Sequence, residues 1–333
     1  AEHSVALRED GTVWTWGHNS RGQLGEASPR SRPTPGPVPQ LSNIIAIAAG
    51  EAHTLALQGD GTVWAWGQNT DGELGDTTRS SRATPGKVID LTGVTAVAAG
   101  ENFSMALRSD GTVWAWGYNG LARSSSATQV PELAQITAVA TGGTHALALQ
   151  QDGTAWAWGE NDWGQLGIGQ LSDSGTARKV VGLTQVTALA AGGAHSLALR
   201  ADGTVRAWGQ NTSGQVGSGI PAERHTPSQL AVLTGVTAVS GGLRHALARR
   251  SDGTLWSWGS NVQGQLGDLS SDVGRVTPAQ LAELAGVSQV VSGGYFSMAL
   301  LNDGSVQAWG ENTFGQLGDG STMQRLVPTL TQL

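Results

Sequence analysis

A histidine recurs along the chain at intervals of about 50 residues, and imidazole is a common metal ligand and general base. The series, in which Phe stands at two positions, is His3, His53, Phe103, His145, His195, His245 and Phe296. Because Phe replaces His twice and no second ligand type lies at a fixed spacing from it, the pattern does not predict a metal site. We expect structural histidines that are satisfied by hydrogen bonds to the backbone.

Two other charged residue types also repeat in phase. Asp-Gly pairs begin at Asp10, Asp60, Asp110, Asp152, Asp202, Asp252 and Asp303. A calcium loop needs several oxygen ligands in a short run, so these pairs indicate turns. Arginines recur before a Pro-containing segment, at Arg32, Arg82, Arg178, Arg224, Arg275 and Arg325. We expect each to hold a loop carboxylate or carbonyl, with anion binding as the alternative.

No catalytic motif stands out. The chain has no Gly-x-Ser-x-Gly elbow, no His-Glu-x-x-His and no phosphate-cradling Gly-x-x-x-x-Gly-Lys. A glycosidase would need two non-repeating acids, which sequence cannot place. We therefore predict a protein that is not an enzyme, with no catalytic residues, no metal and no cofactor.

The stretch Asp60-Gly61-Thr62-Val63-Trp64-Ala65-Trp66-Gly67 and its six copies indicate how these residues are positioned. Large and small side chains alternate in it, which is typical of a strand, and both Trp point to one face. Asp-Gly between two such runs predicts a hairpin with a tight primed turn. With a small-residue strand before it and a Pro-containing strand after it, each repeat supplies three or four short strands.

Repeated small sheets around an axis form a β-propeller, so we predict an all-β, seven-bladed β-propeller built from seven repeats of about 50 residues, with a β-solenoid as the structural rival. Residues 1–333 form a single domain in this interpretation, with repeats beginning near residues 1, 50, 100, 142, 192, 242 and 293. The second Trp of the motif, present in every repeat, should pack blade against blade.

Two irregularities stand out. The third repeat is short: after Tyr118-Asn119-Gly120 it lacks the Gly-x-Leu-Gly loop, which predicts a notch. Strands like Val94–Gly100 occur six times and the other elements seven times. One blade should therefore lack a strand, and its open edge could take part in strand exchange or in a dimer.

Composition narrows the classes of partner. The formal charge is −7 and only Lys87 and Lys179 are lysines, so we expect no general nucleic-acid binding. There is no cysteine, no apolar run of membrane-spanning length and no signal peptide at Ala1, so we expect no membrane insertion. Arg-rich, Lys-poor, Ala-rich usage fits a bacterial origin. The compartment stays unknown, with a secreted or cell-surface bacterial protein as the leaning.

The repeat resembles that of the regulator of chromosome condensation family. The resemblance lies in Gly192-Gly193-Ala194-His195-Ser196-Leu197-Ala198-Leu199, then Asp202-Gly203-Thr204, Trp208-Gly209-Gln210-Asn211 and Gly214-Gln215-Val216-Gly217. It extends over essentially the whole chain and implies a seven-bladed propeller, possibly a bacterial member. The family includes a chromatin-bound exchange factor for a small GTPase, a plant photoreceptor and bacterial inhibitors of β-lactamases.

Residues that depart from the repeat at repeated positions are our candidates for binding. Loops carry recognition while blades share scaffold residues, and large aromatics in polar turns are typical of protein-binding hot spots. The candidates are Trp163, Phe314, Tyr295, Arg244, Tyr118, Arg21 and Asp71. In the β-lactamase inhibitors, positions similar to these carry aromatic contacts. The alternative is that these aromatics pack on neighbouring loops.

We therefore predict a non-enzymatic binding or scaffold propeller that recognises a protein partner through loops on one face. A guanine nucleotide exchange factor for a small GTPase and a glycan-binding propeller are the alternatives.

Overall fold

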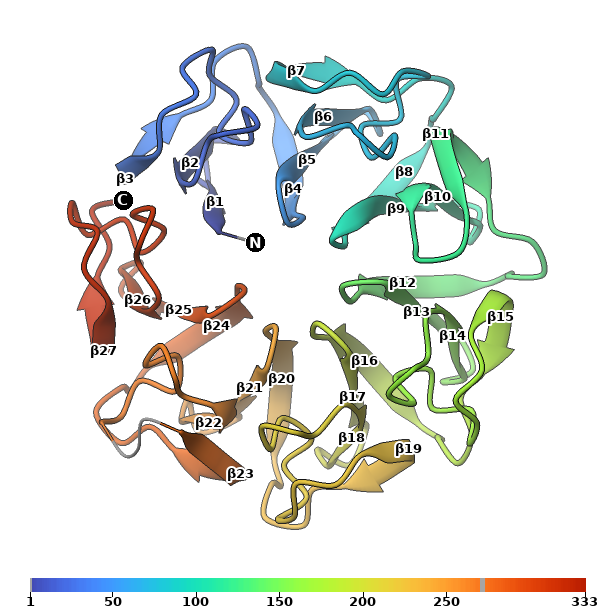
Figure 1. Ribbon diagram of the computed structural model, residues 1–333, viewed down its shortest axis with the longest axis vertical. Coiled ribbons are helices and arrows are strands. Elements are labelled where there is room, and N and C mark those ends of the chain that lie inside the picture. The colour runs from blue at the N-terminus through green and yellow to red at the C-terminus, as the bar shows by residue number, and fades with distance from the viewer. Residues whose placement is uncertain (1, 270–272) are drawn as a thin grey trace.

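The computed structural model describes residues 2–269 and 273–333, and it forms a ring of seven blades around a central axis (Figure 1). In the described ranges every sheet is antiparallel, blades 2 to 7 have four strands and blade 1 has three. No helix occurs in these ranges, and so none that could span a membrane. The predicted all-β propeller, its blade number and the shortage of one strand are confirmed.

The chain runs outward through each blade. The first strands, nearest the axis, are β4 (Ile44–Ala49), β8 (Val94–Ala99), β12 (Ile136–Thr141), β16 (Val186–Ala191), β20 (Val236–Gly241) and β24 (Val287–Ser292). The second strands are β1 (His3–Leu7), β5 (His53–Gln58), β9 (Asn102–Arg108), β13 (His145–Gln150), β17 (His195–Arg200), β21 (His245–Arg250) and β25 (Phe296–Leu301).

The third strands are β2 (Val13–Gly17), β6 (Val63–Gly67), β10 (Val113–Tyr118), β14 (Ala155–Gly159), β18 (Val205–Gly209), β22 (Leu255–Ser260) and β26 (Val306–Gly310). The outer strands are β3 (Arg32–Pro37), β7 (Arg82–Lys87), β11 (Arg123–Gln129), β15 (Ser174–Lys179), β19 (Arg224–Gln229), β23 (Gly274–Gln280) and β27 (Arg325–Leu330). Blade 1 is the sheet of β1 to β3, so the strand that it lacks within the described ranges is the one nearest the axis. What pairs with this edge of β1 stays a prediction.

The turn between second and third strands is not the primed turn that the sequence predicted. In blade 2, Gln58 N–H donates to Thr62 O at 2.8 Å, and Gly61 N–H donates to Gln58 O at 2.9 Å. The loop therefore has three residues, 59–61, between Gln58 and Thr62. Among these three, only Gly61 has a positive φ, of 85°, so the loop is a type I turn followed by a left-handed glycine. The Asp60 carboxylate accepts from Thr62 N–H at 2.9 Å, which lowers its pKa.

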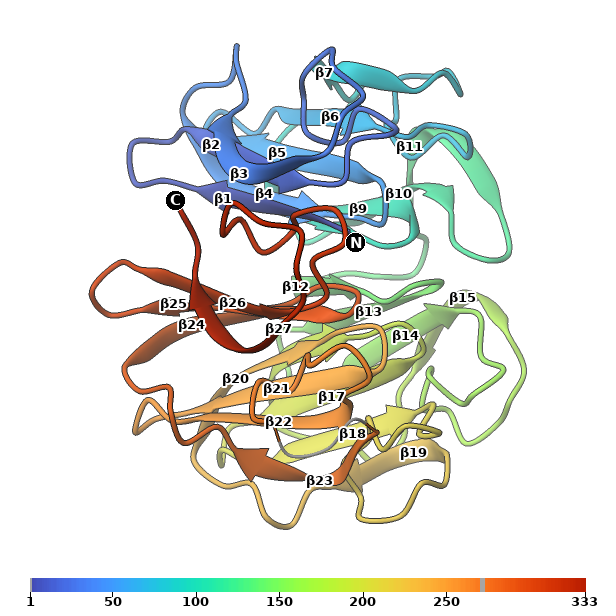
Figure 2. The same ribbon diagram turned by 60° about the vertical axis from the view of Figure 1, so that its left-hand side comes forward.

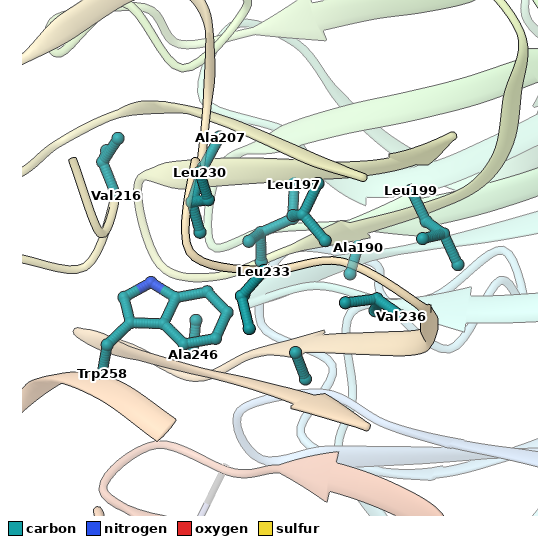
Figure 3. Packing of buried hydrophobic residues seen from close by; sticks show 12 residues of the cluster. Ala190, Leu197, Leu199, Ala207, Val216, Leu230, Leu233, Val236, Ala246 and Trp258 are labelled. Atoms are coloured by element: carbon teal, nitrogen blue, oxygen red, sulfur yellow. The ribbon is translucent and has the colours of Figure 1, made fainter. Parts of the chain in front are cut away.

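Buried apolar clusters fill the space between neighbouring blades. Figure 3 shows the cluster between blades 5 and 6, where Trp258 of β22 lies among Val216, Leu230 and Leu233 of the preceding blade. Turned by 60°, the ring shows neighbouring sheets packed face to face (Figure 2). These interfaces set where each loop lies.

The second Trp of each motif holds its blade to the preceding one, as predicted. In blade 2, the indole Nε1 of Trp66 donates to the backbone carbonyl of Gln23 in the long loop of blade 1, at 2.9 Å. The same bond recurs between Trp16 and Gln316, Trp116 and Glu73, Trp208 and Gln165, Trp258 and Gln215, and Trp309 and Gln265. The pair of Trp16 and Gln316 joins blade 1 to blade 7.

A hydroxyl from the second strand reaches the same loop carbonyl. Thr54 Oγ1 donates to Gln23 O at 2.9 Å, and a carbonyl oxygen has two lone pairs, so it accepts both donors. The equivalent hydroxyls are those of Ser4, Ser104, Ser196 and Ser297.

The repeated histidine binds that hydroxyl. His3 Nε2 lies 2.8 Å from Thr54 Oγ1, and the same contact joins His53 to Ser104, His145 to Ser196 and His245 to Ser297. Because the hydroxyl proton goes to the loop carbonyl, the histidine donates from Nε2–H, and its Nδ1 has no partner. The predicted backbone partner is therefore wrong: the next blade's side chain holds the ring.

The interface between blades 3 and 4 has lost all three parts of this network together. The third repeat has no loop to supply the carbonyl, Phe103 stands at the histidine position, and Ala146 stands at the hydroxyl position. Phe103 and Ala146 are buried in one apolar cluster. The polar network has been replaced by an apolar contact.

The interface between blades 5 and 6 has lost only one part. Ala246 replaces the hydroxyl, and both ring nitrogens of the buried His195 lack a hydrogen-bond partner. The loop carbonyl of Gln215 still accepts from Trp258 at 2.9 Å.

The repeated arginines act mainly on their own loops, as predicted. Ion pairs join Arg32 to Glu26, Arg82 to Asp76, Arg275 to Asp268 and Arg325 to Asp319. Arg178 is out of phase: the strand register puts Ser174 opposite Gly159, where an arginine stands in blade 2. The prediction of a fixed phase is wrong for Arg178.

We expect replacement by serine to change the free energy of unfolding in opposite directions at Ala246 and at Ala146. Ala246→Ser should raise the free energy of unfolding by about 1 kcal/mol, because the new hydroxyl gains both His195 and Gln215 as partners. Ala146→Ser should lower it by about 1–3 kcal/mol, because its hydroxyl would be buried against Phe103 without a loop carbonyl. Urea unfolding of both variants measures this, and shifts of the same sign would contradict it.

Stability should fall steeply with acid. Burial lowers the pKa of His3, His53, His145 and His245 to about 3 and that of His195 to about 4. Between the unfolded value near 6.5 and these values, the unfolded chain binds more protons, so each histidine removes about 1.4 kcal/mol of stability per pH unit.

Thermal unfolding from pH 7.5 to 5.0 should therefore show a falling melting temperature below pH 6.5 and a plateau above it. The control is His195→Phe, which copies the contact of Phe103 with Ala146. This variant should have a shallower pH dependence than the parent, and an unchanged slope would argue against the buried histidines as the cause.

Candidate functional site

All seven predicted binding residues lie at one face of the ring, which we call the loop face. It carries the connections from first to second strands and from third to outer strands, which in blade 2 are residues 50–52 and 68–81. The register places His53 opposite Gly67 and Gly67 opposite Arg82, so these connections emerge at the same end of the blade. The opposite face carries the Asp-Gly turns.

The backbone of the long loop is built alike in the six blades that have one. Trp163 N–H donates to the side-chain oxygen of Gln165 at 3.0 Å. The same bond recurs at Arg21, Asp71, Ser213, Gln263 and Phe314. An asparagine at the start of the loop, such as Asn161, receives a second backbone N–H at 2.9 Å. The loop is thus a shared scaffold, and its variable side chain is free to carry specificity.

Trp163 and Phe314 occupy the same loop position in blades 4 and 7. Both side chains are half-buried. The Phe314 ring stacks on His18 of blade 1, with centroids 4.1 Å apart and planes 19° apart, and His18 Nδ1 lies 3.1 Å from a Glu2 carboxylate oxygen. The Phe314 ring therefore packs on the neighbouring blade, which was the alternative to a role in binding, but the side chain is only half-buried there. No hydrogen bond of the Trp163 indole occurs in the described ranges.

Tyr118 and Asp71 are brought together at the shortened third repeat. Arg123 Nε lies 3.0 Å from an Asp71 carboxylate oxygen, and its guanidinium lies 4.7 Å from the Tyr118 ring centroid. The Tyr118 hydroxyl donates to Gly120 O at 2.7 Å. This cluster bridges blades 2 and 3 where the long loop is missing, and Arg123 was not among the predicted residues.

Arg244 and Tyr295 line one groove of about 750 Å³. They come from the connections that precede β21 and β25, and the other wall belongs to the loop of blade 5, including Thr212 and Pro221. Arg244 is exposed and Tyr295 is half-buried. Arg21 is remote from them, in a hollow of about 250 Å³ beside Ala83 of β7.

The central channel opens at the same face and was missed by the sequence prediction. It has a volume of about 360 Å³ and is lined largely by glycines. Its lining also includes the carboxylates of Glu2, Glu51, Glu101 and Glu311. Burial, and then the neighbouring carboxylate of Glu51, raise the pKa of Glu101, while burial and then Glu2 raise that of Glu311. Because these acids come from four different repeats, only the ring geometry reveals them as a group.

In the described ranges, no group of three or more His, Asp and Glu side chains is arranged to hold a metal ion. The loop face offers aromatic, arginine and carboxylate groups at separate places, which suits recognition of an extended surface.

Known proteins resemble this chain in sequence and in fold. A profile of the RCC1-like domain matches residues 1–219 and 123–333. The solved structure of Prp20p from Saccharomyces cerevisiae, described with its binding properties to Gsp1p and histones, has a TM-score of 0.87 and 27% identity, covering 98% of this chain and 87% of that chain. Yeast RCC1 (Prp20), solved with Kap60 bound to it, has a TM-score of 0.87 and 28% identity, covering 96% of this chain and 83% of that chain.

A curated relative is RUG3, a mitochondrial RCC1 domain-containing protein of Arabidopsis thaliana, 44% identical over 50 residues. That match spans 14% of this chain and 11% of the relative. These relatives are plant and yeast proteins, so they give no support to the bacterial origin that composition suggested. With its repeats, its ring of seven blades and the profile match in agreement, the chain belongs to the RCC1-like domain family.

Proposed function

We propose that this chain is a protein-binding propeller that holds its partner against the loop face. The observation that carries the proposal is the contrast within the long loops. Their backbone hydrogen bonds are the same in six blades, while the side chain between them changes from Arg21 to Asp71, Trp163 and Phe314. A scaffold that is kept constant while its outward side chains vary is typical of a recognition surface.

The chemistry of the chain favours protein as the partner class. A formal charge of −7 disfavours a phosphate backbone, whereas half-buried aromatics beside exposed arginines are typical of protein interfaces. The solved structures of Prp20p are described with Gsp1p, histones and Kap60, all of which are proteins. These relatives support the class of partner.

The proposal predicts that Trp163→Ala weakens partner binding at least tenfold, because truncating a central aromatic anchor removes about 2 kcal/mol or more. Phe314→Ala should have a smaller effect, since its ring already stacks on His18. Proteins retained from the native organism's lysate are identified by mass spectrometry, and their affinity for each variant is then measured by calorimetry.

The matched control is Ile89→Ala. Ile89 is 42% exposed and follows β7 at the opposite face. A partner that loses affinity through Ile89→Ala but binds Trp163→Ala normally would place recognition on the wrong face and refute the proposal.

A more specific candidate is a guanine nucleotide exchange factor for a small GTPase. The observation that favours it is the 27% identity to Prp20p over 98% of this chain, because that protein is described with its binding properties to Gsp1p. Release of a fluorescent guanine nucleotide from a purified small GTPase distinguishes the two. Acceleration that depends on loop-face residues supports exchange, and binding without acceleration leaves recognition alone.

A further inference from the structure

We propose that the groove between blades 5 and 6 on the loop face binds an extended segment of a partner protein, one that presents an apolar side chain next to a carboxylate. This rests on the proposed function and names the site and the chemistry of what it recognises. Pro221, Val262 and Val276 supply apolar walls, while Arg244 and Tyr295 close the end nearest the axis. A volume of about 750 Å³ is within the range of sites that enclose a side-chain cluster.

The groove owes its apolar character to residues that depart from the repeat. Val262 is 57% exposed, and the same loop position is held by Ser20, Thr70, Asp162, Thr212 and Thr313 in the other long loops. Ile220 does not line the groove but precedes Pro221, which does, and it is 51% exposed where blades 2, 4 and 7 have Thr78, Gln170 and Ser321. Exposed apolar residues that scaffold positions do not require, in the groove and next to it in the chain, indicate an interaction site.

Charge selects the second group of the ligand. Arg244 is exposed and forms no ion pair in the described ranges, although the chain carries a formal charge of −7. An exposed guanidinium at the end of an apolar groove favours a carboxylate, which it binds in a bidentate manner. Tyr295 adds a hydroxyl at the same end.

The central channel sets the direction of the ligand. Tyr295 lines both the groove and the channel, and Glu2, Glu51, Glu101 and Glu311 line the channel. An acidic side chain that passed Tyr295 would meet these carboxylates. The ligand carboxylate is therefore confined to Arg244, with its apolar side chain on the outer side.

The chain contains no cysteine, so a single introduced cysteine can carry a fluorophore and report where a ligand sits. Thr212→Cys places the label on the groove wall. Ser20→Cys places it at the same loop position in blade 1. The probe is a random heptapeptide library displayed on phage and selected against the unlabelled chain, with the enriched peptides then synthesised and titrated.

We expect the enriched peptides to carry Asp or Glu beside Leu, Ile, Val or Met, and to change the fluorescence of the Thr212→Cys label. Arg244→Glu should weaken them at least tenfold, and Val262→Thr, which restores the residue of three other blades, should weaken them severalfold. Arg30→Glu is the matched control, an exposed arginine in the long loop of blade 1 on the same face, and it should leave their affinity unchanged.

Three results would overturn the inference. No enrichment would show that the groove does not take a short extended segment. Peptides that report only at the Ser20→Cys label or weaken with Trp163→Ala alone would move binding elsewhere on the loop face, and the proposed function would stand. Peptides that neither label reports and that Ile89→Ala weakens would lie on the opposite face, and both proposals would fail.

Discussion

One backbone carbonyl at each of six interfaces organises this ring. The oxygen of Gln23 accepts the indole N–H of Trp66 and the hydroxyl of Thr54, and that hydroxyl in turn accepts from His3. Three side chains and one loop are thereby fixed relative to each other across two blades. Because the carbonyl belongs to the long loop, the same bonds that join the blades also hold the loop backbone rigid, and the variable side chains project from a fixed base.

The departures from this arrangement show that its parts depend on one another. Where the third repeat lacks the loop, Phe103 and Ala146 replace the histidine and the hydroxyl, so no polar group is left buried without a partner. Where only the hydroxyl is lost, at Ala246, the ring of His195 is left with two unpartnered nitrogens. Burying an unpaired polar group is unfavourable, which explains why the interface of Phe103 with Ala146 is satisfied and that of His195 with Ala246 is not.

Much of the fold could be predicted from the sequence, because strand alternation and the fixed period are local signals. The role of Trp66 in holding two blades together could be predicted because every repeat has a Trp at its position. The turn at Asp60 could not be assigned, since three-residue and two-residue loops share the same Asp-Gly pair. The partner of His3 lies 51 residues away in the next blade, and the channel carboxylates come from separate repeats. Such contacts depend on ring geometry, which no single repeat contains.

Each His–Ser or His–Thr contact joins a residue of one repeat to a residue of the following one, and this has a consequence for how the chain can evolve. A repeat with Ala146 at its hydroxyl position fits behind a repeat with Phe103 and no long loop, but behind a repeat that has the histidine it would leave that ring unpaired. Despite their common motif the repeats are not interchangeable, and duplication or shuffling of single repeats would be selected against. We therefore expect sequence divergence to concentrate at loop tips such as Trp163 and Val262, where a substitution breaks none of the hydrogen bonds between blades.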